Sequence, residues 1–161
     1  MSTHTVRAVI NGVDVECEVE ARTPLADMLR VRLGLVGTKV SCGVQVCGSC
    51  TVLVDGLPVS SCTYLAVDVD ARSVTTIEGV TPGGDGLDPV QQAFVEAGAI
   101  QCGYCTPGFV LAVTALLDEH EDPSDEEAKH FLDGNICRCT GYEQILEAVH
   151  LAGRARCEAR R

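Results

Sequence analysis

Eight of the ten cysteines in this chain of 161 residues fall into two groups of four, and their spacing is typical of metal ligands. In the first group a C-x4-C-x2-C segment is followed by one more cysteine: Cys42, Cys47, Cys50 and Cys62. This spacing predicts a [2Fe–2S] cluster of the plant type. Zinc usually takes its cysteines as two closely spaced pairs, an arrangement that suits this loop poorly.

Two glycines within the first group indicate how the chain could wrap closely around such a cluster. Gly43 and Gly48 can adopt positive φ without the steric cost of a side chain, and they let the backbone approach inorganic sulfide. Backbone N–H groups directed at the anionic cluster would stabilise it and help to set its potential. We therefore predict that both glycines belong to the cluster-binding loop.

The second group combines a CxxC pair with a C-x-C pair: Cys102 and Cys105, then Cys137 and Cys139. Each pair precedes the expected start of a helix, at Thr106 and at Thr140. Helix N-termini offer free N–H groups and the positive end of the helix dipole, which favour thiolates around one metal centre. Spacing alone leaves zinc open here. A second iron–sulfur centre is favoured because the first group already predicts one.

Composition restricts the class of protein. The net charge of −11 argues against binding to nucleic acids or anionic membranes, which requires basic patches. No apolar run approaches the roughly 18 residues of a membrane span, and the first twenty residues resemble no export signal, so we expect a cytoplasmic protein. Structural disulfides are rare in a reducing compartment, which again favours metal ligation by the cysteines.

The first half of the chain, residues 1–78, predicts a small sheet with one helix. Apolar and polar residues alternate on both sides of Asn11-Gly12, the strongest short-range signal for a β-hairpin. The other expected elements are a helix capped by Thr23 that ends near Gly34, a hairpin that turns at Asp55-Gly56, and a short strand within 72–79.

The second half predicts helices only. A Gly/Pro/Asp-rich stretch at 79–89 is interpreted as a linker, and residues 90–161 follow the spacing of four helices, most simply a bundle. Capping boxes are expected at the start of the last two helices: Ser124 with Glu127, and Thr140 with Glu143. The predicted fold class is therefore α+β.

Three stretches together carry a resemblance to a known family: "CGVQVCGSCTVLVDG", "LDPVQQAFVEAGAIQCGYCTPGFV" and "GNICRCTGY". The chain resembles the small iron–sulfur subunit of the molybdenum hydroxylases, of the xanthine dehydrogenase, aldehyde oxidoreductase and aerobic carbon monoxide dehydrogenase types. The match extends over nearly the whole chain. It implies an N-terminal β-grasp domain like that of plant ferredoxins and a C-terminal four-helix domain, with one [2Fe–2S] cluster in each.

The resemblance also implies an order of electron transfer. The cluster of the second group would lie next to a molybdopterin, in a cytosine dinucleotide form, on a large partner subunit. The cluster of the first group would lie farther away, toward FAD on a medium subunit or an external acceptor. Gln101 and Cys139 match residues that contact the pterin. The resemblance implies a dimer of heterotrimers in which this chain has no catalytic residue and only carries electrons.

Three residues depart from common members of the family, and none of them is a predicted ligand: Ser41, Gln45 and Ser49. Because of these departures, the resemblance does not imply the potential or the docking surface of the first cluster. Two alternatives to the subunit hypothesis are a free-standing two-cluster ferredoxin and a zinc-stapled interaction module.

Cys17 and Cys157, which belong to neither group, are expected to be structural.

Overall fold

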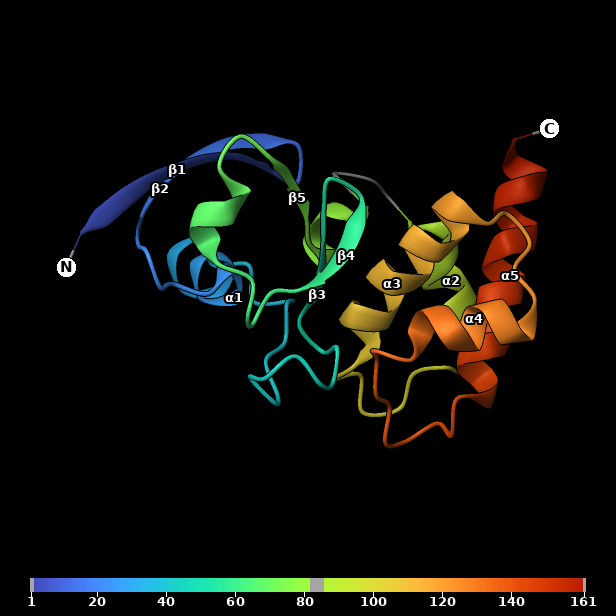
Figure 1. Ribbon diagram of the computed structural model, residues 1–161. Coiled ribbons are helices and arrows are strands. Elements are labelled where there is room, and N and C mark those ends of the chain that lie inside the picture. Colours follow the sequence, from blue (N-terminus) through green and yellow to red (C-terminus); the bar gives the residue numbers. More distant parts are fainter. Residues whose placement is uncertain (1, 82–85, 161) are drawn as a thin grey trace.

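A computed structural model describes residues 2–81 and 86–160 of the chain (Figure 1). A strand-rich first half and a helical second half lie side by side, and the long loops that carry the cysteines emerge at the same edge of the molecule. This confirms the predicted α+β class. The proposed linker, 79–89, lies partly outside the described residues, and its last residue, Pro89, already begins a helix.

Five strands form one mixed sheet in the order β2-β1-β5-β3-β4. The strands are β1 (Thr3–Ile10), β2 (Val13–Glu20), β3 (Thr51–Val54), β4 (Leu57–Ser60) and β5 (Ser73–Thr75). Both predicted hairpins are present, and Asn11 and Asp55 take the positive φ that such two-residue turns require. Strand β5 pairs parallel to β1 and antiparallel to β3, so it joins the two hairpins into one sheet.

The helix expected after the first hairpin is short. It comprises α1 (Leu25–Asp27) and a π-helical continuation, η1 (Met28–Arg32). Thr23 does not cap it, because the N-cap position falls on Pro24 and no side chain caps the helix. Leu25, Met28 and Leu29 are fully buried against the sheet. Two 3-10 turns, η2 (Ala66–Val69) and η3 (Ile77–Gly79), complete the first half.

Four α-helices form the second half: α2 (Pro89–Glu96), α3 (Thr106–Glu119), α4 (Asp125–Leu132) and α5 (Glu143–Ala159). They enclose a separate apolar core that includes Phe94, Phe109 and Ile145. The predicted capping box of α4 is present, since Ser124 Oγ accepts from the Glu127 N–H and Glu127 accepts from the Ser124 N–H. None of the helices described is long and apolar enough to cross a membrane.

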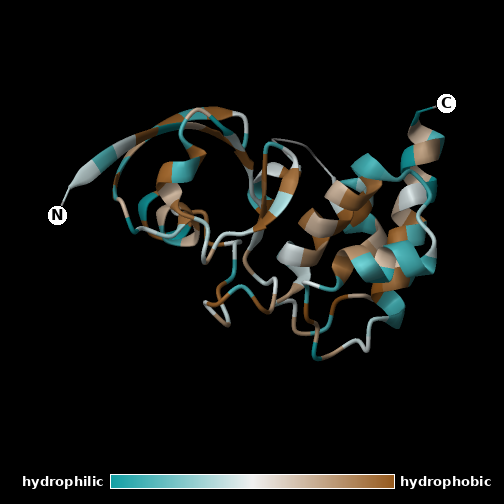
Figure 2. Cartoon of the chain, in the orientation of Figure 1, coloured by the Kyte–Doolittle hydropathy of each residue, from teal (hydrophilic) through white to brown (hydrophobic). Residues whose placement is uncertain are grey.

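Strand β3 is buried on both faces, because one face packs against the core of the sheet and the other against the helical half. Val52 and Val54 belong to the core of the sheet, whereas Leu53 points the other way and packs against Leu111 and Ala115 of α3. Strands β1 and β2, in contrast, alternate between hydrophilic and hydrophobic residues along their length (Figure 2). The cysteine loop that ends at β3 is thereby held against the helical half.

Candidate metal centres

Three cysteines of the first group, Cys42, Cys47 and Cys50, lie on an irregular loop that leads directly into β3, and the fourth, Cys62, follows β4. Gly43 and Gly48 both have the predicted positive φ, 67° and 65°. A Cβ added at Gly43 would meet no atom within 4 Å, whereas one at Gly48 would collide with the carbonyl oxygen of Gly134 and the side chain of Asn135. Gly48 therefore permits both the loop conformation and the close approach of the helical half.

Gln45 shapes the same loop, a role that the sequence did not indicate. It has a φ of 59°, which a residue with a side chain rarely adopts. Its Oε1 atom accepts a hydrogen bond of 2.9 Å from Thr63 Oγ1, next to Cys62. This bond ties the loop of the first three cysteines to the segment that carries the fourth.

The sulfurs of this group lie in different electrostatic surroundings. The N–H groups of Val44 and Val46 donate to Cys42 Sγ at 3.4 and 3.3 Å and lower the pKa of that thiol to about 6. Burial instead raises the pKa of Cys50 to about 11. The hydroxyl of Ser49 lies 3.4 Å from Cys47 Sγ. The loop thus directs its backbone N–H donors at Cys42 Sγ, the sulfur of a residue that is only partly buried.

The second group is assembled from two loops of the helical half. Cys105 is the N-cap residue of α3, so this pair does lie at a helix N-terminus as predicted. The other pair does not, because α5 begins only at Glu143, after Tyr142 with a φ of 73°. The predicted capping box of Thr140 and Glu143 is wrong for the same reason.

Thr140 binds a sulfur instead of capping the helix. Its hydroxyl donates to Cys137 Sγ at 3.2 Å, and its N–H approaches the same atom at 3.5 Å. Tyr142 supports this loop, since its hydroxyl accepts from the Cys137 N–H at 3.2 Å. Burial raises the pKa of Cys105 to about 12, whereas at Cys137 burial is outweighed by the donors from Thr140 and the pKa is lowered.

The eight thiols lie as four pairs of neighbours: Cys42 with Cys47, Cys50 with Cys62, Cys102 with Cys139, and Cys105 with Cys137. Across the residues described, no three metal-binding side chains converge on a position for a single ion. Two pairs per group fit a [2Fe–2S] cluster, because each iron takes two cysteine thiolates. A tetrahedral zinc site would draw all four thiolates of a group around one point.

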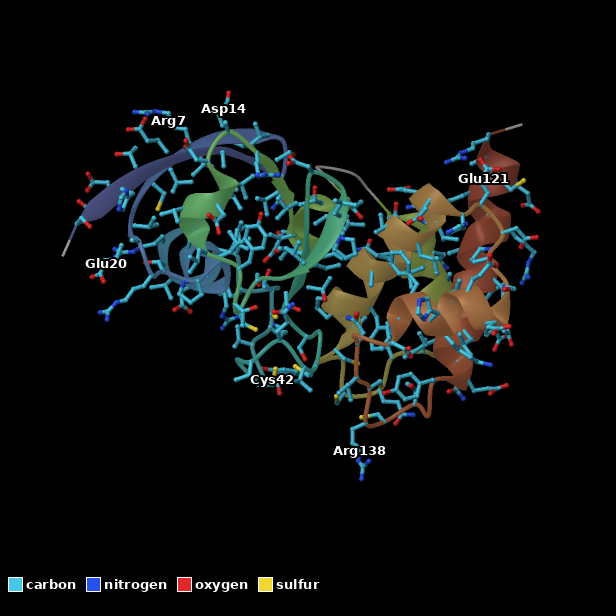
Figure 3. All side chains as sticks on the ribbon, viewed as in Figure 1. Arg7, Asp14, Glu20, Cys42, Glu121 and Arg138 are labelled. Carbon is cyan, nitrogen blue, oxygen red and sulfur yellow. The ribbon has the colours of Figure 1, made fainter. Side chains whose placement is uncertain are left out.

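The two groups are connected by hydrogen bonds between their loops. The Ile136 N–H donates to the carbonyl oxygen of Cys47 at 2.9 Å, so a residue adjacent to Cys137 is bonded to a residue of the first group. Beside it, Asn135 Nδ2 donates to the Gly48 carbonyl oxygen at 3.1 Å. Cys42 and Arg138, labelled in Figure 3, accordingly mark the same edge of the molecule.

Comparisons with known proteins agree with this division into two cluster-binding halves. The family described as "2Fe-2S iron-sulfur cluster binding domain" matches residues 8–74, and the family described as "[2Fe-2S] binding domain" matches residues 76–150. The xanthine dehydrogenase iron-sulfur-binding subunit of Escherichia coli O157:H7 is 44% identical over 149 residues, which cover 91% of this chain and 92% of that protein. The chain belongs to the iron–sulfur subunits of the molybdenum hydroxylases.

Solved structures place this iron–sulfur subunit in the same family. A chain of quinoline 2-oxidoreductase from Pseudomonas putida 86 superposes with a TM-score of 0.92 and 41% identity, over 97% of both chains. Aldehyde oxidoreductase from Desulfovibrio gigas gives a TM-score of 0.91 and 38% identity over 98% of this chain, which corresponds to 18% of that longer chain. The protein is thus the electron-transfer part of an oxidoreductase, with two [2Fe–2S]-binding domains.

Apolar residues of the iron–sulfur subunit are exposed beside both cysteine groups. Val44 and Val46 on the first loop are 65% and 59% exposed, and Ile136 on the second is 44% exposed. Figure 2 shows hydrophobic segments along these loops at the lower edge of the molecule. Gln101 and Cys139 are exposed in the same region. Exposed apolar groups around a functional site are typical of a surface that a partner covers.

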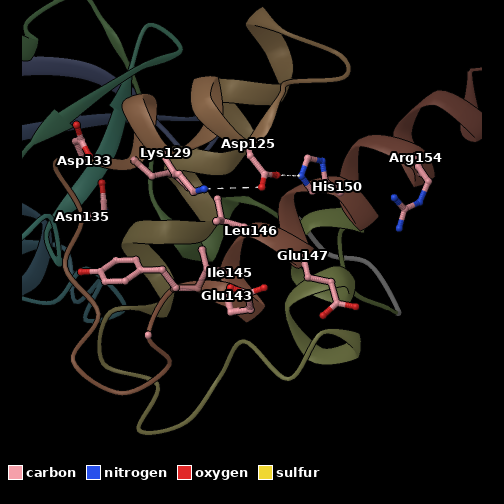
Figure 4. Close-up of a pocket in the computed structure, with 13 residues that line it drawn as sticks. Asp125, Lys129, Asp133, Asn135, Glu143, Ile145, Leu146, Glu147, His150 and Arg154 are labelled. Atoms are coloured by element: carbon pink, nitrogen blue, oxygen red, sulfur yellow. Dashed lines mark hydrogen bonds and ion pairs between the residues drawn. The ribbon is translucent and has the colours of Figure 1, made fainter.

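A cavity of about 750 Å³ between α4 and α5 is separate from the cysteines, since no sulfur lines it. Lys129 and His150 approach Asp125 from two sides, at 3.8 and 2.6 Å (Figure 4). The hydrogen bond from His150 lowers the pKa of this carboxyl group. The His150–Asp125 contact connects α4 to α5, the two helices that flank the second cysteine loop, whereas Lys129 and Asp125 both belong to α4.

Cys17 and Cys157 lie outside both groups. Cys17 is partly buried against the core of the sheet, as expected for a structural residue. Cys157 lies in the last helix, near the end of α5, and is exposed.

Proposed function

We propose that this chain carries electrons from a molybdenum centre on a large partner subunit, through two clusters in series, to FAD or an external acceptor. The observation that carries the proposal is the hydrogen bond from Ile136 to Cys47, because it links two complete sets of four thiols. A [2Fe–2S] cluster supplies a site that gains and loses one electron at a time. The chain holds the two sites at a fixed separation, and it keeps one ligand of each set, Cys50 and Cys137, away from solvent.

The ligands of the first cluster are proposed to be Cys42, Cys47, Cys50 and Cys62, within a loop shaped by Gly43 and Gly48. The ligands of the second are proposed to be Cys102, Cys105, Cys137 and Cys139. The pairing of the thiols supports both sets. We keep the domain boundaries predicted from the sequence, 1–78 and 90–161, as part of this proposal.

The second cluster is proposed to face the molybdopterin, bound as a cytosine dinucleotide by the large subunit. Gln101 and Cys139 would contact the pterin, and both are exposed at the edge where the second group lies. An exposed amide can donate to and accept from a polar ring system, which suits Gln101 for this contact. In the Desulfovibrio gigas protein the part that matches this chain is 18% of one longer chain.

The first cluster is proposed to face FAD on a medium subunit. The exposed Val44 and Val46 support a protein partner at this loop, because a docked surface would remove them from water. We also propose a cytoplasmic complex, a dimer of heterotrimers, as the resemblance to the family implies.

The experiment is to purify the untagged protein from its native host and to measure iron, molybdenum and flavin in the purified complex. We expect larger chains to co-purify, with about four irons for each molybdenum, since two clusters contain two irons each. Iron without molybdenum on a lone small chain would contradict the proposal and indicate a two-cluster ferredoxin. A colourless protein that contains zinc would indicate an interaction module instead.

A further inference from the structure

We infer that Ser49 is a positioning residue that raises the reduction potential of the cluster held by the first cysteine group, through a hydrogen bond to Cys47. The inference rests on the proposed function, in which the Cys47 thiolate binds iron. It assigns a role to a residue that is not itself a ligand.

Geometry places the Ser49 hydroxyl at one ligand sulfur and keeps solvent away from it. Ser49 Oγ lies 3.4 Å from Cys47 Sγ, and Ser49 is only 5% exposed. The backbone that leads into Ser49 is fixed, because the Cys47 carbonyl oxygen accepts from Ile136 and the Gly48 carbonyl oxygen accepts from Asn135. Water therefore competes little for this hydroxyl, and the loop has little freedom to turn it away.

The direction of this hydrogen bond follows from the chemistry of the two groups. In a free thiol, either the sulfur or the oxygen could supply the proton. A cysteine that binds iron is a thiolate and has no proton to donate. The Ser49 hydroxyl must then be the donor, and the sulfur of Cys47 the acceptor.

A donor at a ligand sulfur favours the reduced form of the cluster. Reduction adds one negative charge, and a hydrogen bond to a more negative acceptor is stronger. Hydrogen bonds to the sulfurs are among the factors that set the potential of an iron–sulfur cluster. Ser49 should therefore draw electrons toward the first cluster and away from the second.

The second group contains a corresponding donor, which makes the balance between the clusters testable. The Thr140 hydroxyl donates to Cys137 Sγ at 3.2 Å and should favour the reduced form of the second cluster in the same way. Removing the hydroxyl of Ser49 or that of Thr140 should thus shift the distribution of one shared electron in opposite directions.

The test is a redox titration of the purified native complex, followed by electron paramagnetic resonance. For Ser49→Ala we expect a lower midpoint potential of the first cluster and an equilibrium constant for electron transfer to it that falls about tenfold, or ~59 mV for one electron. The potential of the second cluster should stay unchanged. Ser49→Thr keeps a hydroxyl and should restore the potential. Thr140→Ala should lower the potential of the second cluster.

Ser41→Ala is the matched control, because Ser41 is an exposed serine of the same loop, next to Cys42. It should leave both potentials unchanged. Ser49→Ala with a retained cluster and an unchanged midpoint potential would overturn the inference, as would an equal shift in Ser41→Ala. Failure of this inference can be told apart from failure of the proposed function. A chain that purifies alone without molybdenum would contradict the proposed function, but the potentials of both clusters could still be titrated in it.

Discussion

The two cysteine groups hold their sulfurs by different means. The first relies mainly on the loop before β3, whose positive-φ residues and backbone N–H groups surround Cys42, and the hydrogen bond that Thr63 donates to Gln45 ties this loop to the segment of Cys62. The second relies on helices that bring two loops together, and its Cys137 receives a side-chain hydroxyl. The first site is therefore determined mainly by local conformation, and the second mainly by the packing of α3, α4 and α5.

The largest expected effect is the loss of one cluster at a time. Cys50→Ala should remove only the first cluster and Cys105→Ala only the second, so that the iron content of each variant falls from about four to about two atoms per chain. Iron analysis and visible absorption would measure this. Cys157→Ala, at an exposed cysteine of α5, should retain all the iron. Loss of all iron from either ligand variant would show that the two sites are not built separately.

A pair of glycine variants sharpens the role of local conformation. Gly43→Ala and Gly48→Ala both place a side chain at positive φ, which costs about 1–2 kcal/mol. Only Gly48→Ala also collides with the helical half, which should lower the free energy of unfolding by about 1–3 kcal/mol more. Chemical denaturation of both variants would measure the difference. Equal losses would contradict the close contact at Gly48.

The contact between the groups depends on Asn135, which is buried and donates to the Gly48 carbonyl oxygen and to Thr51 Oγ1. Asn135→Ala should cost about 1–3 kcal/mol, because buried acceptors lose their donor. It should also weaken the magnetic coupling between the reduced clusters. Asp133→Ala, at an exposed neighbour, is the control. An unchanged magnetic coupling in Asn135→Ala would show that other contacts are enough to hold the two clusters at their normal separation.

The smallest effect should come from a site remote from both loops. Ser124→Ala removes the cap of α4 and should cost about 1 kcal/mol of stability without changing either potential. The hydrogen bond from Ser124 lowers the pKa of Glu127 below its usual 4.5. The stability from this bond is present above the usual value and is lost as pH falls through the lowered pKa. Thermal unfolding at two pH values would detect this loss of stability. A shifted cluster potential in Ser124→Ala would contradict the claim that the cap acts only on stability.

Much of this structure was predictable from short segments of sequence. The turns at Asn11-Gly12 and Asp55-Gly56 and the cap at Ser124 were predicted correctly, because each depends on residues within a few positions. The cap at Thr140 was not, since its hydroxyl has a competing acceptor in Cys137 Sγ. The pattern S/T-x-x-E does not reveal such a competitor.

The contacts between the two groups could not be predicted from the sequence. Asn135 and Gly48 are 87 positions apart, and no local pattern relates an amide in one loop to a glycine in another. The spacing of the cysteines predicted the two ligand sets and the resemblance implied their order in the electron path, but neither indicated these contacts. The left-handed conformation of Gln45 was equally hidden, because its bond to Thr63 forms only in the folded loop.

The central claim is that this chain holds two separate [2Fe–2S] clusters within one electron path. The most direct measurement is the electron paramagnetic resonance spectrum of the fully reduced native complex. We predict two distinct signals of equal intensity, broadened by mutual coupling, of which Cys50→Ala abolishes one and Cys105→Ala the other. A single signal, or the loss of both signals in either variant, would contradict the account.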